Sequence, residues 1–145
     1  MTSQDRKKVE WLSRYRHICN RIFCKLDEEA RWMSIATKIT PTMSDMPKAQ
    51  SNSSKIETAV EKIDEIKEQI QQEIGTLMKE RAEIEATIQS LPSERDREIF
   101  ERKYIRGQYW EQIAVDMHYE YHYLVSLHSI AIKSLHIENI INNHT

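Results

Sequence analysis

Glycine and proline are scarce in this sequence, with two Gly and three Pro among 145 residues. So few turn-forming residues argue against an all-β fold. The two glycines, Gly75 and Gly107, cannot form the Gly-x-Gly-x-x-Gly loop that cradles phosphates. There is no run of 18 apolar residues, so we expect no membrane contact. The N-terminus is charged throughout and has no apolar segment of a signal peptide, which indicates a cytoplasmic protein.

The two cysteines are also too few for a disulfide framework or a zinc site. Cys19 and Cys24 are five residues apart, and on a helix this spacing points them to different faces. We therefore expect reduced thiols, as in a cytosolic protein.

Charged residues, in contrast, are abundant at 30%, and the sequence is rich in Glu, Lys, Ile and Gln, which is typical of long amphipathic helices. Residues 1–48 carry ten Lys and Arg against six Asp and Glu, so this segment is basic. Residues 49–91 carry five against nine, and residues 92–145 carry six against eight. The basic first segment and the acidic second one suit each other as neighbours.

Two long apolar stripes predict two helices, at about residues 6–39 and 54–90, because apolar residues recur in each at steps of three and four. Two prolines and a Ser/Asn cluster between them predict a loop over residues 40–53. Ser54 and Glu57 have the spacing of a capping box. We expect residues 1–91 to form a long antiparallel, coiled-coil-like hairpin. It should self-associate as a homo-oligomer, because two helices leave apolar surface uncovered.

The segment Leu91-Pro92-Ser93 marks a boundary, and Ser93 is a good N-cap for the helix that follows. Three short helices are predicted after it, at about residues 94–105, 109–117 and 120–138. Their outline over residues 92–145 is that of a three-helix helix-turn-helix domain. The predicted fold class is therefore all-α.

Two stretches resemble known proteins. Residues 104–114, Tyr-Ile-Arg-Gly-Gln-Tyr-Trp-Glu-Gln-Ile-Ala, resemble region 4 of bacterial sigma factors, and residues 131–135 continue that pattern. The loop at residues 38–47, Lys-Ile-Thr-Pro-Thr-Met-Ser-Asp-Met-Pro, is similar to one in small phage-encoded proteins with a coiled-coil N-terminal half and a sigma-like end. The ArpU-type phage late-gene regulators are possible relatives. The resemblance implies DNA-linked gene control by a phage or prophage in a bacterial host.

Two positions depart from the sigma-like pattern. Glu120 stands where a serine usually caps the recognition helix, and its charge lies near where a DNA phosphate would come. His118 stands where a turn glycine is usual, and it would need a positive φ there.

The third of these helices would lie in the major groove of double-stranded DNA, with its outward face reading bases. The expected base-reading residues are Tyr121, His122, Val125, Ser126 and Ser129. The expected contacts to the DNA backbone are Arg102, Lys103, Arg106 and Lys133. A plain solvated face is the alternative for all of them, since the helix carries one lysine against two glutamates.

Two other functions stay open. The chain could be a helical interaction module that docks on host RNA polymerase with weak or no DNA binding, or a small DNA-packaging (terminase-like) recognition subunit. An enzyme is not expected, because no pattern of catalytic residues stands out. We expect no cofactor and no metal, since His118 and His122 have a helical ligand spacing but no third ligand.

Overall fold

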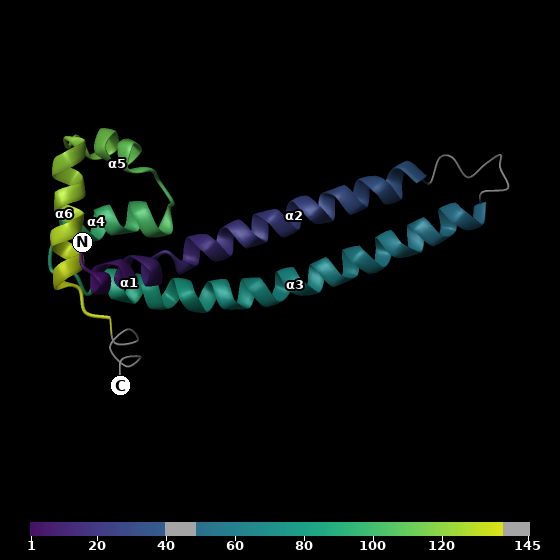
Figure 1. The fold of residues 1–145 in the computed structure, drawn as a ribbon, viewed down its shortest axis with the longest axis horizontal. Helices are drawn as coiled ribbons and strands as arrows, with labels where there is room; N and C mark the ends of the chain where they lie inside the picture. The colour runs from purple at the N-terminus through teal and green to yellow at the C-terminus, as the bar shows by residue number, and fades with distance from the viewer. Residues whose placement is uncertain (40–48, 138–145) are drawn as a thin grey trace. The chain divides into compact units, whose positions relative to one another are not determined.

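The structure is a computed structural model that describes residues 1–39 and 49–137, and every regular element in those ranges is helical. The elements, coloured along the chain in Figure 1, are α1 (Ser3–Leu12), α2 (Arg14–Ile39), α3 (Ala49–Gln89), α4 (Glu94–Phe100), the π-helix η2 (Glu101–Ile105), α5 (Trp110–Met117) and α6 (Tyr121–Ser134). The prediction of an all-helical chain is confirmed for these ranges. None of the described helices has the length and apolar character needed to cross a bilayer.

The chain divides into two units, which are described separately. Unit 1 combines residues 1–17 with residues 77 onward, and unit 2 comprises residues 18–76. This grouping differs from the expected boundary at residue 91, because α1 packs against α6. The ammonium group of Lys8 donates hydrogen bonds to the carbonyl oxygens of Ile132 (2.9 Å) and Lys133 (3.4 Å) at the end of α6. The Ile132 carbonyl also accepts from the Leu135 N–H (3.2 Å), so Lys8 adds a second donor at the end of the helix.

The N-terminal stretch forms two helices, so the prediction of one helix over 6–39 is wrong. Thr2 caps α1 in a capping box with Asp5, which starts the helix at Ser3. The break falls at Ser13, whose hydroxyl and backbone N–H both donate to the carbonyl of Val9. A side chain that competes for backbone groups in this way favours a helix end.

Helix α3 begins at Ala49, earlier than the predicted start at residue 54. Ser54 therefore lies inside the helix, and the predicted capping box with Glu57 is wrong. Of the predicted loop 40–53, residues 49–53 are helical, and residues 40–48 lie outside the described residues. The phage-like loop motif falls mostly in that part.

Within unit 2, the segments of α2 and α3 run antiparallel. Arg21 forms an ion pair with Glu73 (3.2 Å), and Lys25 donates to the Gln69 side chain (3.1 Å), so rising numbers in α2 meet falling numbers in α3. Ile18, Ala59, Ile66 and Ile70 are buried in this unit. Much of the apolar stripe predicted for the first helix stays exposed, and both cysteines are free thiols.

The core of unit 1 is apolar and draws on all of its helices. Its fully buried large side chains are Leu12, Ile84, Ile88, Ile99, Phe100, Ile113, Leu124 and Ile132. One polar pair lies among them: the Tyr104 hydroxyl and Nε2 of His128 share a hydrogen bond of 2.6 Å. The rings of Phe100 and Trp110 pack on the same imidazole, with centroids 5.1 and 4.7 Å away.

Two of the C-terminal helices, α4 and α6, end earlier than predicted. The predicted helix 94–105 is α-helical only to Phe100; beyond it, the Arg106 N–H donates to the carbonyl of Glu101, five residues back, as in a π-helix. Helix α6 ends at Ser134, not at 138, because Leu135 takes an extended conformation (ψ 133°). The predicted N-cap at Ser93 is confirmed.

The turn between α5 and α6 depends on His118, which has left-handed backbone angles of φ 59° and ψ 41°. The expected positive φ is therefore confirmed. The Tyr119 N–H then donates to the carbonyl of Ala114 (3.0 Å), which closes the end of α5. Glu120 caps α6, because its carboxylate accepts from the Tyr123 N–H (3.0 Å).

We expect His118→Gly to raise the free energy of unfolding by about 0.5–1 kcal/mol. Glycine adopts the left-handed conformation without the steric cost of a Cβ, although it adds freedom to the unfolded chain. Urea unfolding followed by circular dichroism measures the change. His118→Ala is the control, since it removes the imidazole but keeps the Cβ; a gain of the same size in both variants would contradict this explanation.

A second prediction concerns His128. Burial lowers the pKa of His128 to about 4, and the nearby Lys103 ammonium acts in the same direction. In the unfolded chain a histidine titrates near pH 6.5. Between these values the unfolded chain binds the extra proton, so the contribution of neutral His128 is complete above about pH 6.5 and is lost as the pH falls towards 4. From pH 7 to pH 5 the loss should be about 2 kcal/mol.

His128→Gln should flatten this pH dependence, because an amide can still bond to Tyr104 but does not titrate. The exposed His17→Gln is the control and should keep the wild-type slope. The measurement is the free energy of unfolding in urea at half-unit steps from pH 7.5 to 4.5. Equal slopes for wild type and His128→Gln would show that His128 is not the titrating group.

Candidate nucleic-acid interface

Helices α5 and α6 pack closely at their crossing and leave one face of α6 uncovered. Ile113 and Ala114 of α5 are buried, as are Leu124 and Leu127 of α6. The small side chain of Ala114 lets the two helices approach. Because α6 is held along one side, its opposite side is free to meet a partner.

Four of the five predicted base-reading residues lie on or beside this uncovered face, whereas Tyr121 has the spacing of the buried Leu124 and His128 and is exposed at the first turn of α6. Tyr121, His122 and Ser126 are exposed, and Val125 and Ser129 are half-buried at its edge. His122, Ser126 and Ser129 follow each other at steps of four and three, so they form one row on the helix. The structure thus brings four of the predicted residues together and leaves Tyr121 apart from them, and contact with bases stays a prediction.

The N-terminus of α6 carries a fixed negative charge. One carboxylate oxygen of Glu120 accepts from the Tyr123 N–H, and the other lies 2.9 Å from Nδ1 of His122. The hydrogen bond from the His122 ring and those from backbone N–H groups lower the pKa of Glu120. The carboxylate is therefore ionised at neutral pH. With Nδ1 donating to it, a neutral His122 keeps Nε2 as an acceptor.

Two of the four predicted DNA-backbone contacts are held inside unit 1. The Arg102 guanidinium lies between the carboxylates of Glu98 (3.1 Å) and Asp116 (3.3 Å), and its side chain is only 18% exposed. The ammonium group of Lys103 lies 5.0 Å from the centre of the Trp110 ring, and burial lowers the pKa of Lys103. Both side chains would have to leave these contacts to reach a phosphate.

The other two predicted contacts are more accessible. Arg106 is exposed, with Glu101 at 3.4 Å. Lys133 is exposed on the last turn of α6, on the same side as Ser126 and Ser129 by helical spacing. Lys133 is therefore the best placed of the four for a phosphate beside the uncovered face.

The sequence reasoning missed Lys8, which fixes the end of α6 from another helix. The sequence shows a run of basic residues at 6–8. Only the packing of α1 on α6 shows that Lys8, the last of them, donates to the carbonyls of Ile132 and Lys133. The spacing of Thr2 and Asp5 is that of a capping box. It could have predicted that the first helix begins at Ser3 and not at residue 6.

The surface around α5 is acidic and apolar, unlike the polar row on α6. Glu111 and Asp116 are exposed on this short helix, together with Val115, which is 69% exposed. Tyr109 before α5 is also largely exposed, and Ile130, four residues after Ser126, is an exposed apolar side chain on the uncovered face of α6. Acidic and apolar groups of this kind suit a protein surface better than a phosphate backbone.

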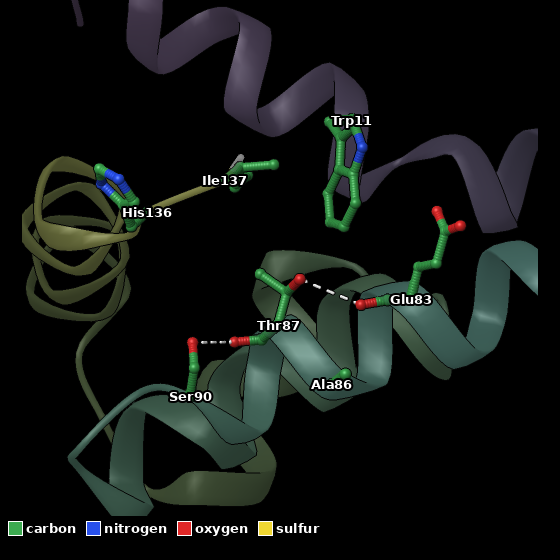
Figure 2. A pocket seen from close by; sticks show the side chains of 7 residues that line it. All are labelled: Trp11, Glu83, Ala86, Thr87, Ser90, His136 and Ile137. Carbon is green, nitrogen blue, oxygen red and sulfur yellow. Dashed lines mark hydrogen bonds between the residues drawn. The ribbon is translucent and has the colours of Figure 1, made fainter. Parts of the chain in front are cut away.

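A cavity of about 390 Å³ lies elsewhere in unit 1 (Figure 2), lined by Trp11, Glu83, Ala86, Thr87, Ser90, His136 and Ile137. Its two hydroxyls turn back to their own helix: Thr87 donates to the carbonyl of Glu83 and Ser90 to that of Thr87, as the dashed lines show. The other polar groups of its lining are the Glu83 carboxylate, the His136 imidazole and Nε1 of Trp11, which has no hydrogen-bond partner among the described residues. In the described ranges, no three His, Cys, Asp or Glu side chains converge as metal ligands would.

Comparison of the chain with protein-family models, with curated proteins and with solved structures gave no match.

Proposed function

We propose that this chain is a sequence-specific regulator of transcription that binds double-stranded DNA, encoded by a phage or prophage. In this proposal α5, the turn at His118 and α6 are a helix-turn-helix unit, and α6 is the recognition helix. The observation that carries it is the left-handed turn, which crosses α5 against α6 and leaves the row of His122, Ser126 and Ser129 uncovered. The sigma-like resemblance of residues 104–114 supports the same function.

The proposed roles follow from the chemistry of each group. Hydroxyls of Tyr121 and Ser126 can donate to or accept from base edges, and Nε2 of His122 can accept from an amino group of adenine or cytosine. Val125 would contact a thymine methyl. Lys133 would meet a phosphate. Since Arg102 and Lys103 are held by internal contacts, phosphate contacts should be few and the salt dependence of binding shallow.

The finer organisation is part of the proposal. We assign the paired helices of residues 18–76 to the antiparallel hairpin, and residues 92–145 to the DNA-binding end, in a cytoplasmic protein of the bacterial host. The acidic balance of the DNA-binding end then implies that specificity comes from hydrogen bonds to bases more than from general attraction to DNA.

A direct test uses duplexes selected from a library of 20 random base pairs, with binding followed by fluorescence anisotropy at low salt. Ser126→Ala and His122→Ala should each reduce the preference for selected over random duplexes by about 1–3 kcal/mol. Lys133→Ala should weaken both duplexes alike and lower the salt slope by about one.

Ser134→Ala is the matched control for Ser126→Ala. Ser134 is also an exposed serine of α6, but its hydroxyl donates to the carbonyl of Ala131 (2.9 Å), so its loss should leave the preference unchanged. If the library yields no selected duplex at 50 mM salt, where attraction to the backbone is strong, the proposal is wrong.

The acidic and apolar surface of α5 favours a second candidate, a docking module for a protein such as host RNA polymerase. Glu111 and Glu120 oppose a phosphate backbone, while Val115 and Tyr109 offer apolar contact area. Val115→Gln, which removes apolar contact area without adding a charge, distinguishes the two functions. It should abolish capture of purified polymerase if docking is the function, and it should leave DNA binding unchanged.

A further inference from the structure

Unit 2 has a polar side and an apolar side. Six polar side chains line one shallow cleft along the helix pair: Arg21 and Lys25 of α2, and Gln69, Gln72, Glu73 and Thr76 of α3. The cleft shows which flank of each helix lies on this side of the pair. By helical periodicity, the opposite flanks of both helices must lie together on the other side.

Those opposite flanks are mostly apolar, with one charged residue, Lys67, between Ile63 and Ile74 on α3. On α2 they carry Cys19, Phe23, Leu26, Ala30 and Met33, and on α3 they carry Ile56, Val60, Ile63 and Ile74. The α2 residues follow each other at steps of four, three, four and three, the spacing of a coiled-coil seam. None of the nine is buried, and Phe23 is 61% exposed. We call this set the open face.

We propose that the open face is covered by the open face of a second copy of this chain, so that two helix pairs form a four-helix bundle. A face about 25 Å long and about 20 Å wide buries on the order of 1,000 Å² in total, which is at the lower end for specific interfaces. The dimer should therefore be stable but should dissociate in the micromolar range.

Charges at the edges of the open face select the orientation of the two copies. Arg31 and Lys38 lie on the outer edge of α2, and Glu57 and Asp64 lie on the outer edge of α3; all four are exposed. A two-fold axis parallel to the helices places α2 of one copy beside α3 of the other. An axis across the helices would instead place the acidic edges of the two α3 helices against each other.

The register within one copy makes this match specific. Arg21 lies level with Glu73, and Lys25 lies level with Gln69, so each step forward in α2 is a step back in α3. Continued along the pair, this rule brings Arg31 level with residue 63, and Lys38 level with residue 56. With a parallel two-fold axis, Arg31 meets Asp64 of the second copy and Lys38 meets Glu57. Asp27, the acidic residue on the α2 edge, falls level with Lys67.

This inference goes beyond the proposed function and does not require DNA binding to be correct. It assigns the expected self-association to one face of residues 18–76 and gives it a direction. Its test is carried out on the full chain without DNA, so a failure here can be distinguished from a failure of DNA binding.

The decisive experiment compares two glutamate substitutions by sedimentation equilibrium. Met33 and Ile35 are each 41% exposed and lie two residues apart on α2, but Met33 is on the open face and Ile35 is on the opposite side. Met33→Glu should raise the dimer Kd at least tenfold, and Ile35→Glu should leave it within about twofold of wild type. Circular dichroism checks that both variants keep the wild-type helix content.

A wild-type chain that is monomeric up to about 200 μM would overturn the proposal, and so would equal weakening by the two substitutions. The orientation has its own test by charge reversal at low salt. Arg31→Glu and Asp64→Arg should each weaken the dimer, and the double variant should recover at least half of the loss. Losses that simply add in the double variant would rule out the parallel two-fold axis.

Discussion

The hydrogen bond between Tyr104 and His128 is the constraint on which unit 1 depends. Both side chains sit in an apolar core, and His128 is only 4% exposed, so each polar atom would lack a partner without the other. An unsatisfied buried group costs about 1–3 kcal/mol, which makes the pair a strict geometric requirement. It ties η2 to the middle of α6, while the rings of Phe100 and Trp110 enclose the imidazole.

The Tyr104–His128 pair fixes which side of α6 faces outward. The imidazole of His128 faces the core from the middle of the helix, and Lys8 holds the carbonyls at its end. With two independent anchors, α6 cannot rotate without breaking buried contacts. The row of His122, Ser126 and Ser129 therefore stays on the outer side, and a rigid element of this kind is what a recognition surface needs.

Local sequence signals predicted much of this fold. The N-cap at Ser93, the left-handed residue at His118 and the inward face of α6 each depend on a few neighbouring residues, so spacing and residue type are sufficient to find them. The break at Ser13 was missed because the apolar pattern continues across it. The π-helix at 101–105 was missed because its apolar spacing also fits an α-helix.

The candidate site was harder to predict for a different reason. Exposure of His122 and Ser126 follows from helical periodicity alone, whereas Tyr121 has the spacing of the buried Leu124 and His128 and is exposed only at the first turn of α6. The internal ion pairs of Arg102 do not, because Asp116 lies 14 residues away and approaches only after α5 packs on η2. A basic residue in the sequence is therefore an uncertain guide to a phosphate contact. Long-range partners decide whether its charge faces solvent.

The electrostatics link the two parts of the proposed function. A recognition helix with one exposed lysine and a carboxylate at its N-terminus gains little from general attraction to DNA, so a single copy would bind weakly. Pairing two copies through the open face of residues 18–76 makes the second contact intramolecular and raises its effective concentration. A dimer of weakly binding copies would discriminate better between DNA sequences, because binding would require two matched half-sites. Contacts to the DNA backbone would contribute little of the binding free energy. On this argument, the proposed dimer would make the acidic character of residues 92–145 compatible with sequence-specific DNA binding.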